Sequence, residues 1–245
     1  MLHMKLPLTC FECMKDEKQF MYDMLQGKLY NVTINDTGLY KMTCERGHTT
    51  YTMLQNGKFE ILFDMGIYAF QDGYYRESVA NFAASLERFY EYSIRLFCFI
   101  NGINESVVDL AWKNVAAQSE RQFGAYCFLY VSLLAKTPDV ISNSNIKFRN
   151  KVIHQGYIPT FEETLNYATS IYNFIMKEIV MYKRNYNNVC QEMVFRRLTR
   201  LKEKAQKDNF INVATCCLPT ALSFTSSTDR IPSFEETIKK HIRLP

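Results

Sequence analysis

Apolar side chains recur at helical spacing through the middle of the chain. In the stretch 74–100 they are three or four residues apart, which places them on one face of a helix. These positions are Val79, Phe82, Leu86, Tyr90, Ile94 and Phe97. On the outer face of the same stretch Glu91 precedes Arg95 by four residues, the favourable order for a helical ion pair. The pattern predicts a long amphipathic helix that packs against others.

Further helices are predicted before and after this one. The stretch 58–73 has helical periodicity, and 105–136 does too, with an interruption expected between Gln118 and Gly124. Thr160 and Glu163 have the spacing of a capping box and mark the start of another helix. Ser233 and Glu236 repeat that spacing before a terminal helix. Glycine and proline are scarce, at 9 and 6 residues, which also favours a mainly α protein.

The first part of the chain follows another pattern. Residues 28–34 and 49–54 are rich in β-favouring side chains, and turn-prone pieces lie around them. We therefore predict three regions. They are a ribbon of short strands at 1–58, a helical domain at 59–183 and a basic helical C-terminal extension at 184–245.

Composition narrows the class of protein only slightly. The chain has 245 residues, 47% of them hydrophobic, and a formal net charge of +4, which is compatible with a polyanionic partner. The sequence predicts neither a secretory signal nor a membrane span. Eight cysteines without such a signal indicate a reducing compartment, so we expect a cytoplasmic protein.

Two close pairs of potential metal ligands lie in the first region. Cys10 and Cys13 form one pair, and Cys44 and His48 form the other. Three thiolates and one imidazole suit tetrahedral zinc without an open position, so this set predicts a structural zinc site of the ribbon type. The alternative is a group of ordinary reduced cysteines with a surface histidine.

A second candidate site is the segment "RNKVIH", with Arg149, Asn150 and His154. By itself this spacing has a structural explanation, in which the arginine contacts carboxylates and the histidine caps a helix end near Gly156. The chemistry of these three residues offers a second, functional explanation. A histidine exchanges protons near neutral pH, and the planar cation of an arginine fits phosphate oxygens. Asn150 can orient either the imidazole or a phosphate.

With its surroundings, this segment resembles the HEPN family (higher eukaryotes and prokaryotes nucleotide-binding), whose signature is an Arg, a polar residue and a His four to six positions after the Arg. The segments 73–94 and 154–175 look like the family's long early helix and its closing helix. The resemblance covers residues 59–183. It implies an α-helical bundle and a metal-independent endoribonuclease in which the ribose 2′-OH attacks its own phosphodiester.

The family also implies partners. HEPN ribonucleases form homodimers whose two motifs line one cleft, and many serve as toxins or antiviral effectors that a neighbouring protein restrains. A site shared between two copies of the chain would also help to bring the arginine and histidine side chains together. Arg149 and His154 are about 140° apart on an ideal helix, so one copy alone does not bring their backbone positions onto one side. RNA is the expected substrate, and DNA should resist because it lacks the 2′-OH.

The C-terminal region adds a basic segment with Arg196, Arg197 and Arg200. These side chains can follow an RNA backbone, although such a run is also typical of a solvated helix face. Two rival functions stay open. One is a non-catalytic HEPN module that binds RNA, a nucleotide or a protein, and the other is a DNA-binding regulator that acts through the ribbon.

Overall fold

The computed structural model describes residues 4–16, 29–207, 213–223 and 231–241. Helices account for 62% of the described residues, which confirms the prediction of a mainly helical protein with small sheets near its N-terminus. The chain divides into two compact units. We call residues 57–193 and 220–241 the helical unit, and residues 1–56, 194–219 and 242–245 the β unit. Parts of the N-terminal and C-terminal regions predicted from the sequence lie outside the described residues.

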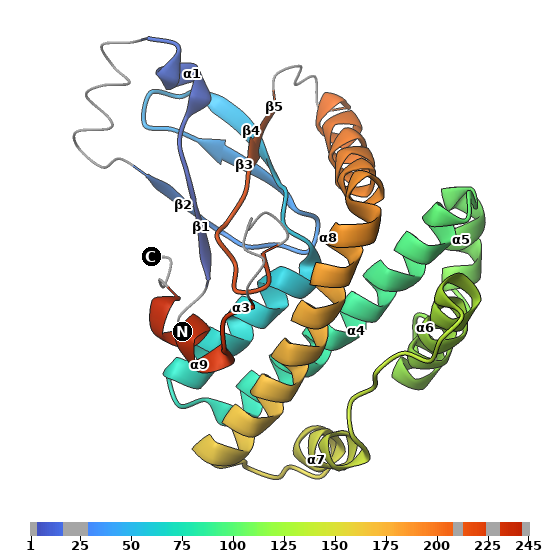
Figure 1. Cartoon of the computed structure of the whole chain (residues 1–245). Helices are drawn as coiled ribbons and strands as arrows, with labels where there is room; N and C mark the ends of the chain where they lie inside the picture. The colour runs from blue at the N-terminus through green and yellow to red at the C-terminus, as the bar shows by residue number, and fades with distance from the viewer. Residues whose placement is uncertain (1–3, 17–28, 208–212, 224–230, 242–245) are drawn as a thin grey trace. The chain divides into compact units, whose positions relative to one another are not determined.

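The helical unit contains the long amphipathic helix that the apolar pattern predicts. This helix, α4, packs against α3, α5, α6 and α7, and Figure 1 shows it beside α3. The unit's helices are α3 (Lys58–Gln71), α4 (Tyr75–Ile100), α5 (Glu105–Trp112), α6 (Ser119–Leu134), α7 (Asn143–His154), the first part of α8 (Phe161–Gln206) and α9 (Phe234–Lys240).

Aromatic side chains fill the core of this unit. The ring centroid of Phe89 on α4 lies 5.3 Å from that of Phe59 on α3 and 6.0 Å from that of Tyr182 on α8. Helices α3 and α4 come close together at Gly66, where an added Cβ would lie only 2.6 Å from the ring of Phe82. A glycine is required there because any side chain would displace that buried ring. The fully buried large residues of the unit include Phe63, Phe82, Phe89, Phe97, Tyr126, Tyr172 and Tyr182.

The helix starts follow the predicted caps. The backbone N–H of Glu163 donates to Thr160 Oγ1 at 3.2 Å, and the backbone N–H of Thr160 donates to the Glu163 carboxylate at 2.9 Å. Ser233 and Glu236 make the same reciprocal pair at the start of α9. Both predicted capping boxes are therefore confirmed.

One detail of the helices differs from the sequence prediction. The interruption expected between Gln118 and Gly124 comes earlier, because α5 ends at Trp112 and α6 begins at Ser119. The basic segment is helical as predicted, since α8 (Phe161–Gln206) consists of two helices that join at a kink at Tyr186 (φ −138°, ψ 25°) and the second of them carries this segment. Residues 161–193 of this helix belong to the helical unit and residues 194–206 to the β unit.

The β unit holds two small sheets. Strands β1 (Lys5–Leu8) and β2 (Tyr30–Thr33) pair antiparallel, with Leu6 opposite Val32. Strands β3 (Leu39–Thr43) and β4 (Thr49–Leu54) form an antiparallel hairpin. Strand β4 is buried along nearly its whole length because it is the central strand of its sheet.

The third strand of that sheet comes from far along the sequence. Strand β5 (Val213–Cys216) pairs parallel with β4, with Tyr51 opposite Val213. Just after it, the backbone N–H of Leu218 donates to the Asn56 side chain at 2.7 Å, and the Asn56 amide donates back to the Leu218 carbonyl at 3.0 Å. This reciprocal pair fixes the C-terminal segment to the end of β4.

Candidate functional site

The structure brings the four predicted metal ligands of the β unit together. The ligand atoms of Cys10, Cys13, Cys44 and His48 all lie within 4.8 Å of one another. The three cysteines are buried, and the histidine lies at the exposed edge of the cluster. This group can hold a metal ion, so the prediction of a ligand cluster is confirmed.

Two tight turns position these ligands. In the first pair, Cys10 is the N-cap of the short helix α1 (Phe11–Met14) and Cys13 lies within it, and the backbone N–H of Met14 donates to the Cys10 carbonyl at 3.1 Å. The second pair lies in the turn between β3 and β4, where the N–H of Gly47 donates to the Cys44 carbonyl at 2.9 Å. Gly47 has a φ of +81°, a left-handed conformation that a glycine adopts without strain.

The separations suit a tetrahedral ion. Metal–sulfur bonds of about 2.3 Å and metal–nitrogen bonds of about 2.0 Å require ligand atoms about 3.5–3.8 Å apart. Cys13 Sγ lies 3.8 Å from Cys44 Sγ and 3.3 Å from His48 Nδ1, and Cys10 Sγ lies 3.9 Å from that nitrogen. The donor set is soft and offers four ligand atoms from the protein, as expected of a structural site.

The close packing of the four ligand residues also shifts the pKa values of the cysteine thiols. Burial and the neighbouring Cys10 and Cys44 thiols raise the pKa of Cys13 to about 12. Burial also acts to raise the pKa of Cys44, but backbone N–H groups of Arg46 and His48 outweigh it and the pKa lies below its usual value. A cation bound here would displace the thiol protons and relieve the crowding.

The motif residues of the helical unit lie on α7. The Ser142 hydroxyl caps this helix by accepting the backbone N–H of Asn145 at 3.3 Å. His154 is the last residue of α7, and its side chain is exposed. Arg149 and Asn150 lie one turn earlier and are half-buried. The helix thus ends with an imidazole open to solvent.

A single copy of the chain brings the guanidinium and the imidazole together. Arg149 Nη1 lies 3.5 Å from His154 Nε2, the long limit of a hydrogen bond. The same Nη1 donates to Asn150 Oδ1 at 2.9 Å, so the asparagine orients the arginine and not the imidazole. The length of the arginine side chain closes the angular gap that the helix geometry predicted.

Sequence reasoning missed one member of this group. Glu87 on α4 lies 62 residues before Arg149, and its carboxylate accepts from Arg149 Nη2 at 2.7 Å. The only signal in the sequence is its place on the helix. Glu87 shares a face of α4 with Ala83 and Tyr90, at steps of four and three, and so interrupts an otherwise apolar stripe.

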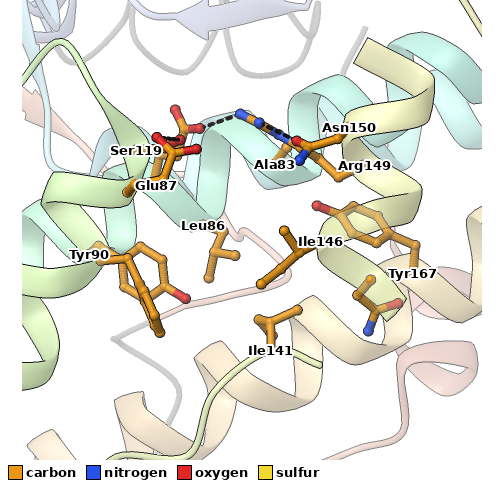
Figure 2. A pocket seen from close by; sticks show the side chains of 13 residues that line it. Ala83, Leu86, Glu87, Tyr90, Ser119, Ile141, Ile146, Arg149, Asn150 and Tyr167 are labelled. Atoms are coloured by element: carbon orange, nitrogen blue, oxygen red, sulfur yellow. Dashed lines mark hydrogen bonds and ion pairs between the residues drawn. The ribbon is translucent and has the colours of Figure 1, made fainter. Parts of the chain in front are cut away.

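A pocket lies beside this group and is formed by α4, α6, α7, α8 and the loop before α7 (Figure 2). It has a volume of about 650 Å³, open space at the mouth included. Glu87, Arg149 and Asn150 lie along one edge, and most of the remaining wall consists of apolar and aromatic side chains, with Ser119, Glu120 and Asn145 as its other polar residues. All of these residues belong to the helical unit.

The three arginines proposed for RNA binding lie on the last part of α8, in the β unit. Arg196 and Arg200 are exposed, and Arg197 is half-buried. Arg197 donates to the backbone carbonyls of Gln55 and Asn56, the latter at 2.8 Å. This arginine therefore helps to hold the end of β4 in place.

Comparison of the chain with protein-family models, with curated proteins and with solved structures gives no match. Within the described residues, none of the helices has an apolar stretch long enough to cross a membrane. Any function must therefore be argued from the geometry of the two candidate sites.

Proposed function

We propose that the protein is a metal-independent endoribonuclease of the HEPN type, with Arg149, Asn150 and His154 at its centre. The supporting observation is the 3.5 Å approach of the Arg149 guanidinium to an exposed His154 imidazole. A phosphodiester at this point would lie within reach of a fixed cation and of an imidazole that can accept or donate a proton. The resemblance of "RNKVIH" to the family signature agrees with this reading.

The chemistry needs no metal ion because RNA carries its own nucleophile. In the proposed reaction His154 Nε2 takes the proton of a ribose 2′-OH, and the 2′-oxygen attacks the adjacent phosphorus. The bond from phosphorus to the 5′-oxygen breaks, that oxygen takes up a proton, and the products are a 2′,3′-cyclic phosphate and a 5′-OH. Arg149 stabilises the negative charge on the non-bridging oxygens.

The surrounding contacts suggest how the arginine is prepared for this task. A donor N–H from Arg149 to His154 Nε2 requires the neutral imidazole, and this long contact is replaced when Arg149 turns to the phosphate and Nε2 takes the 2′-OH proton. Glu87 and Asn150 fix the guanidinium plane, which limits the conformational entropy lost when a phosphate binds. The second proton transfer is assigned to the same imidazole in a second copy, in the homodimer that the resemblance implies.

We also propose that the cluster of Cys10, Cys13, Cys44 and His48 holds structural zinc. The closed soft ligand set and the separations between its atoms support this assignment. The ion would organise the turns of the β unit and would take no part in RNA cleavage. The family further suggests a toxin or antiviral role under the control of a partner protein.

Cleavage of single-stranded RNA in the presence of EDTA tests the ribonuclease proposal. We expect wild-type protein to cut RNA but not the 2′-deoxy analogue, and His154→Ala and Arg149→Ala to lower the rate by at least about 100-fold each. Arg76→Ala is the matched control, since Arg76 is an exposed arginine of the same unit that pairs only weakly with Glu77, at 3.6 Å. Circular dichroism in EDTA controls for loss of the ion from the β unit.

The Glu87 ion pair favours a second candidate, a non-catalytic module that binds RNA, a nucleotide or a protein. Both Nη atoms of Arg149 already have partners within the chain, as expected for an arginine with a structural task. Intact RNA in every condition, with the motif variants folded and equal to wild type, would select this candidate over the enzyme.

A further inference from the structure

The pocket beside Arg149 carries two buried phenols that the proposed reaction does not use. Tyr90 on α4 and Tyr167 on α8 are 5% and 3% exposed. Figure 2 shows both hydroxyls pointing toward the interior of the pocket. Within the described part of the chain, neither hydroxyl makes a hydrogen bond, and neither is among the fully enclosed polar atoms that lack a partner, so both are accessible from the pocket. The pocket thus presents two free polar groups on an apolar wall.

The phenols remain neutral in this environment. Burial raises the pKa of both Tyr90 and Tyr167 above the usual value. Each hydroxyl can therefore donate one hydrogen bond and also accept one at any physiological pH. The Asn145 amide, which also lines the pocket, adds another donor and acceptor.

The aliphatic part of the pocket wall can pack against the two faces of a planar ring. Leu86 comes from α4, Ile141 from the loop before α7 and Ile146 from α7, and Figure 2 shows these three side chains between the two tyrosines. Aliphatic side chains provide van der Waals contact to a planar molecule without demanding a polar partner. A molecule with apolar faces and a hydrogen-bonding edge matches this combination of surfaces.

Arg149 links the pocket to the reaction centre. Its guanidinium lies at the edge of the pocket and also 3.5 Å from His154 Nε2. A nucleotide whose phosphate meets Arg149 could place its base only on the pocket side or in solvent. Most of the wall is apolar, and the Glu120 carboxylate that also lines the pocket repels anions, so the pocket is unsuited to a second phosphate.

We propose that this pocket binds one unstacked nucleobase of the RNA, next to the linkage that is cut. Tyr90 and Tyr167 read the base edge, and Leu86, Ile141 and Ile146 contact its faces. The inference rests on the proposed function for the identity of the ligand as RNA. It assigns to the enzyme a preference for base identity that the Arg149–His154 pair alone does not provide.

An apolar side chain of a partner protein is the main rival occupant. Such a side chain would leave both phenol hydroxyls without hydrogen bonds in a closed pocket, which is unfavourable. A nucleobase satisfies them, because every base has donors and acceptors at its edge. The observation of two free hydroxyls therefore favours the base.

The test is equilibrium binding of short 2′-O-methyl oligonucleotides, which cannot be cleaved because the attacking hydroxyl is blocked. One set carries each of the natural bases, and one oligonucleotide has the same backbone but an abasic position. We expect one base or base class to bind about tenfold more tightly than the abasic chain. Tyr90→Phe and Tyr167→Phe should each lower that affinity about five- to tenfold without affecting the abasic chain.

Two further variants sharpen the result. Tyr172→Phe is the matched control, since Tyr172 is a buried tyrosine of the same unit whose hydroxyl contacts Thr237 outside the pocket. The Tyr172→Phe variant should bind each oligonucleotide with the same affinity as wild type. Ile146→Trp should remove the base preference by filling the pocket, and this position tolerates a larger side chain because Ile146 is 43% exposed. Circular dichroism checks that each variant folds.

The outcomes separate this inference from the proposed function. Equal binding of all bases and the abasic chain, or loss of abasic binding in the Tyr→Phe variants, overturns the base site even if RNA is cut. Base-selective binding by a protein that leaves RNA intact keeps the base site and overturns the enzyme. Tighter binding of an apolar peptide than of any oligonucleotide, lost in Ile146→Trp, identifies the rival occupant instead.

Discussion

The helical unit and the β unit are each stabilised internally in a different way. The helical unit has a continuous core of aromatic rings, with Phe63, Phe89 and Tyr182 among its fully buried members. The β unit has short strands of four to six residues and two small sheets, and its cysteines are among its most buried side chains. Burial of apolar surface stabilises the first, whereas ligand bonds to an ion can stabilise the second.

This difference shows how unlike two parts of one polypeptide can be in their sources of stability. Strands this short give little apolar burial each, so a region built from them needs a metal ion or distant partners in the sequence. Helices with several buried rings need neither. The expected effects of perturbation therefore differ in kind between the units.

Removal of the proposed metal ion should produce the largest effect. A structural zinc ion contributes about 10–16 kcal/mol to folding in small zinc-binding peptides. We expect Cys13→Ser, or chelation with EDTA, to abolish amide-exchange protection in β3 and β4. The fluorescence of Trp112, the only tryptophan, should be unchanged because it lies in the helical unit.

The control for this experiment is Cys127→Ser, which changes a half-buried thiol on α6 outside the cluster. Metal content by mass spectrometry should fall to zero in Cys13→Ser and stay near one ion per chain in the control. Protected strands in a metal-free wild-type protein would show that the cluster is not a folding element.

A cavity in the aromatic core should have the next largest effect. Phe89 is completely buried, so Phe89→Ala should lower the free energy of unfolding of the helical unit by about 3–5 kcal/mol. Phe128→Ala is the matched control, since Phe128 is 81% exposed. Urea unfolding followed by Trp112 fluorescence measures both. An equal decrease in the free energy of unfolding in the two variants would contradict the assignment of Phe89 to the core.

The smallest effect concerns pH. Glu178 lies in the core of the helical unit with one carboxylate oxygen lacking a partner among the described residues, and burial raises its pKa from 4.5 to about 7. Between these values the folded state binds more protons than the unfolded state, so stability falls as pH rises. We expect a loss of about 2–4 kcal/mol between pH 4.5 and pH 8.

Glu178→Gln should flatten that slope and leave the helical unit more stable than wild type at pH 8. Glu162→Gln changes an exposed carboxylate of the same helix and should keep the wild-type slope. Thermal unfolding across this pH range gives the comparison. A Glu178→Gln protein with an unchanged slope would show that another group is responsible.

Local features of the fold could be predicted from the sequence. The apolar spacing from Val79 to Phe97 and the caps at Thr160 and Ser233 depend on residues within a few positions of one another. The metal ligands were predictable for a related reason, since each pair forms one tight turn and the ion requires the two pairs to meet. Such signals survive in a single sequence because local chemistry determines them.

Long-range features could not be predicted in this way. Nothing near Val213 indicates that it pairs with Tyr51, and nothing near Arg149 points to Glu87. Both contacts depend on how helices and strands pack in three dimensions. The pocket has the same origin, because Tyr90 and Tyr167 are 77 residues apart in the sequence and line one pocket only in the folded unit.

The parallel pairing of β5 with β4 has a consequence for biosynthesis. Strand β4 leaves the ribosome well over 100 residues before its neighbour is made, so during most of translation one of its edges has no native partner. An unpaired edge of this kind is a template for association with other chains. A nascent polypeptide that stops before residue 213 would therefore be prone to aggregate, however well its helices had already folded.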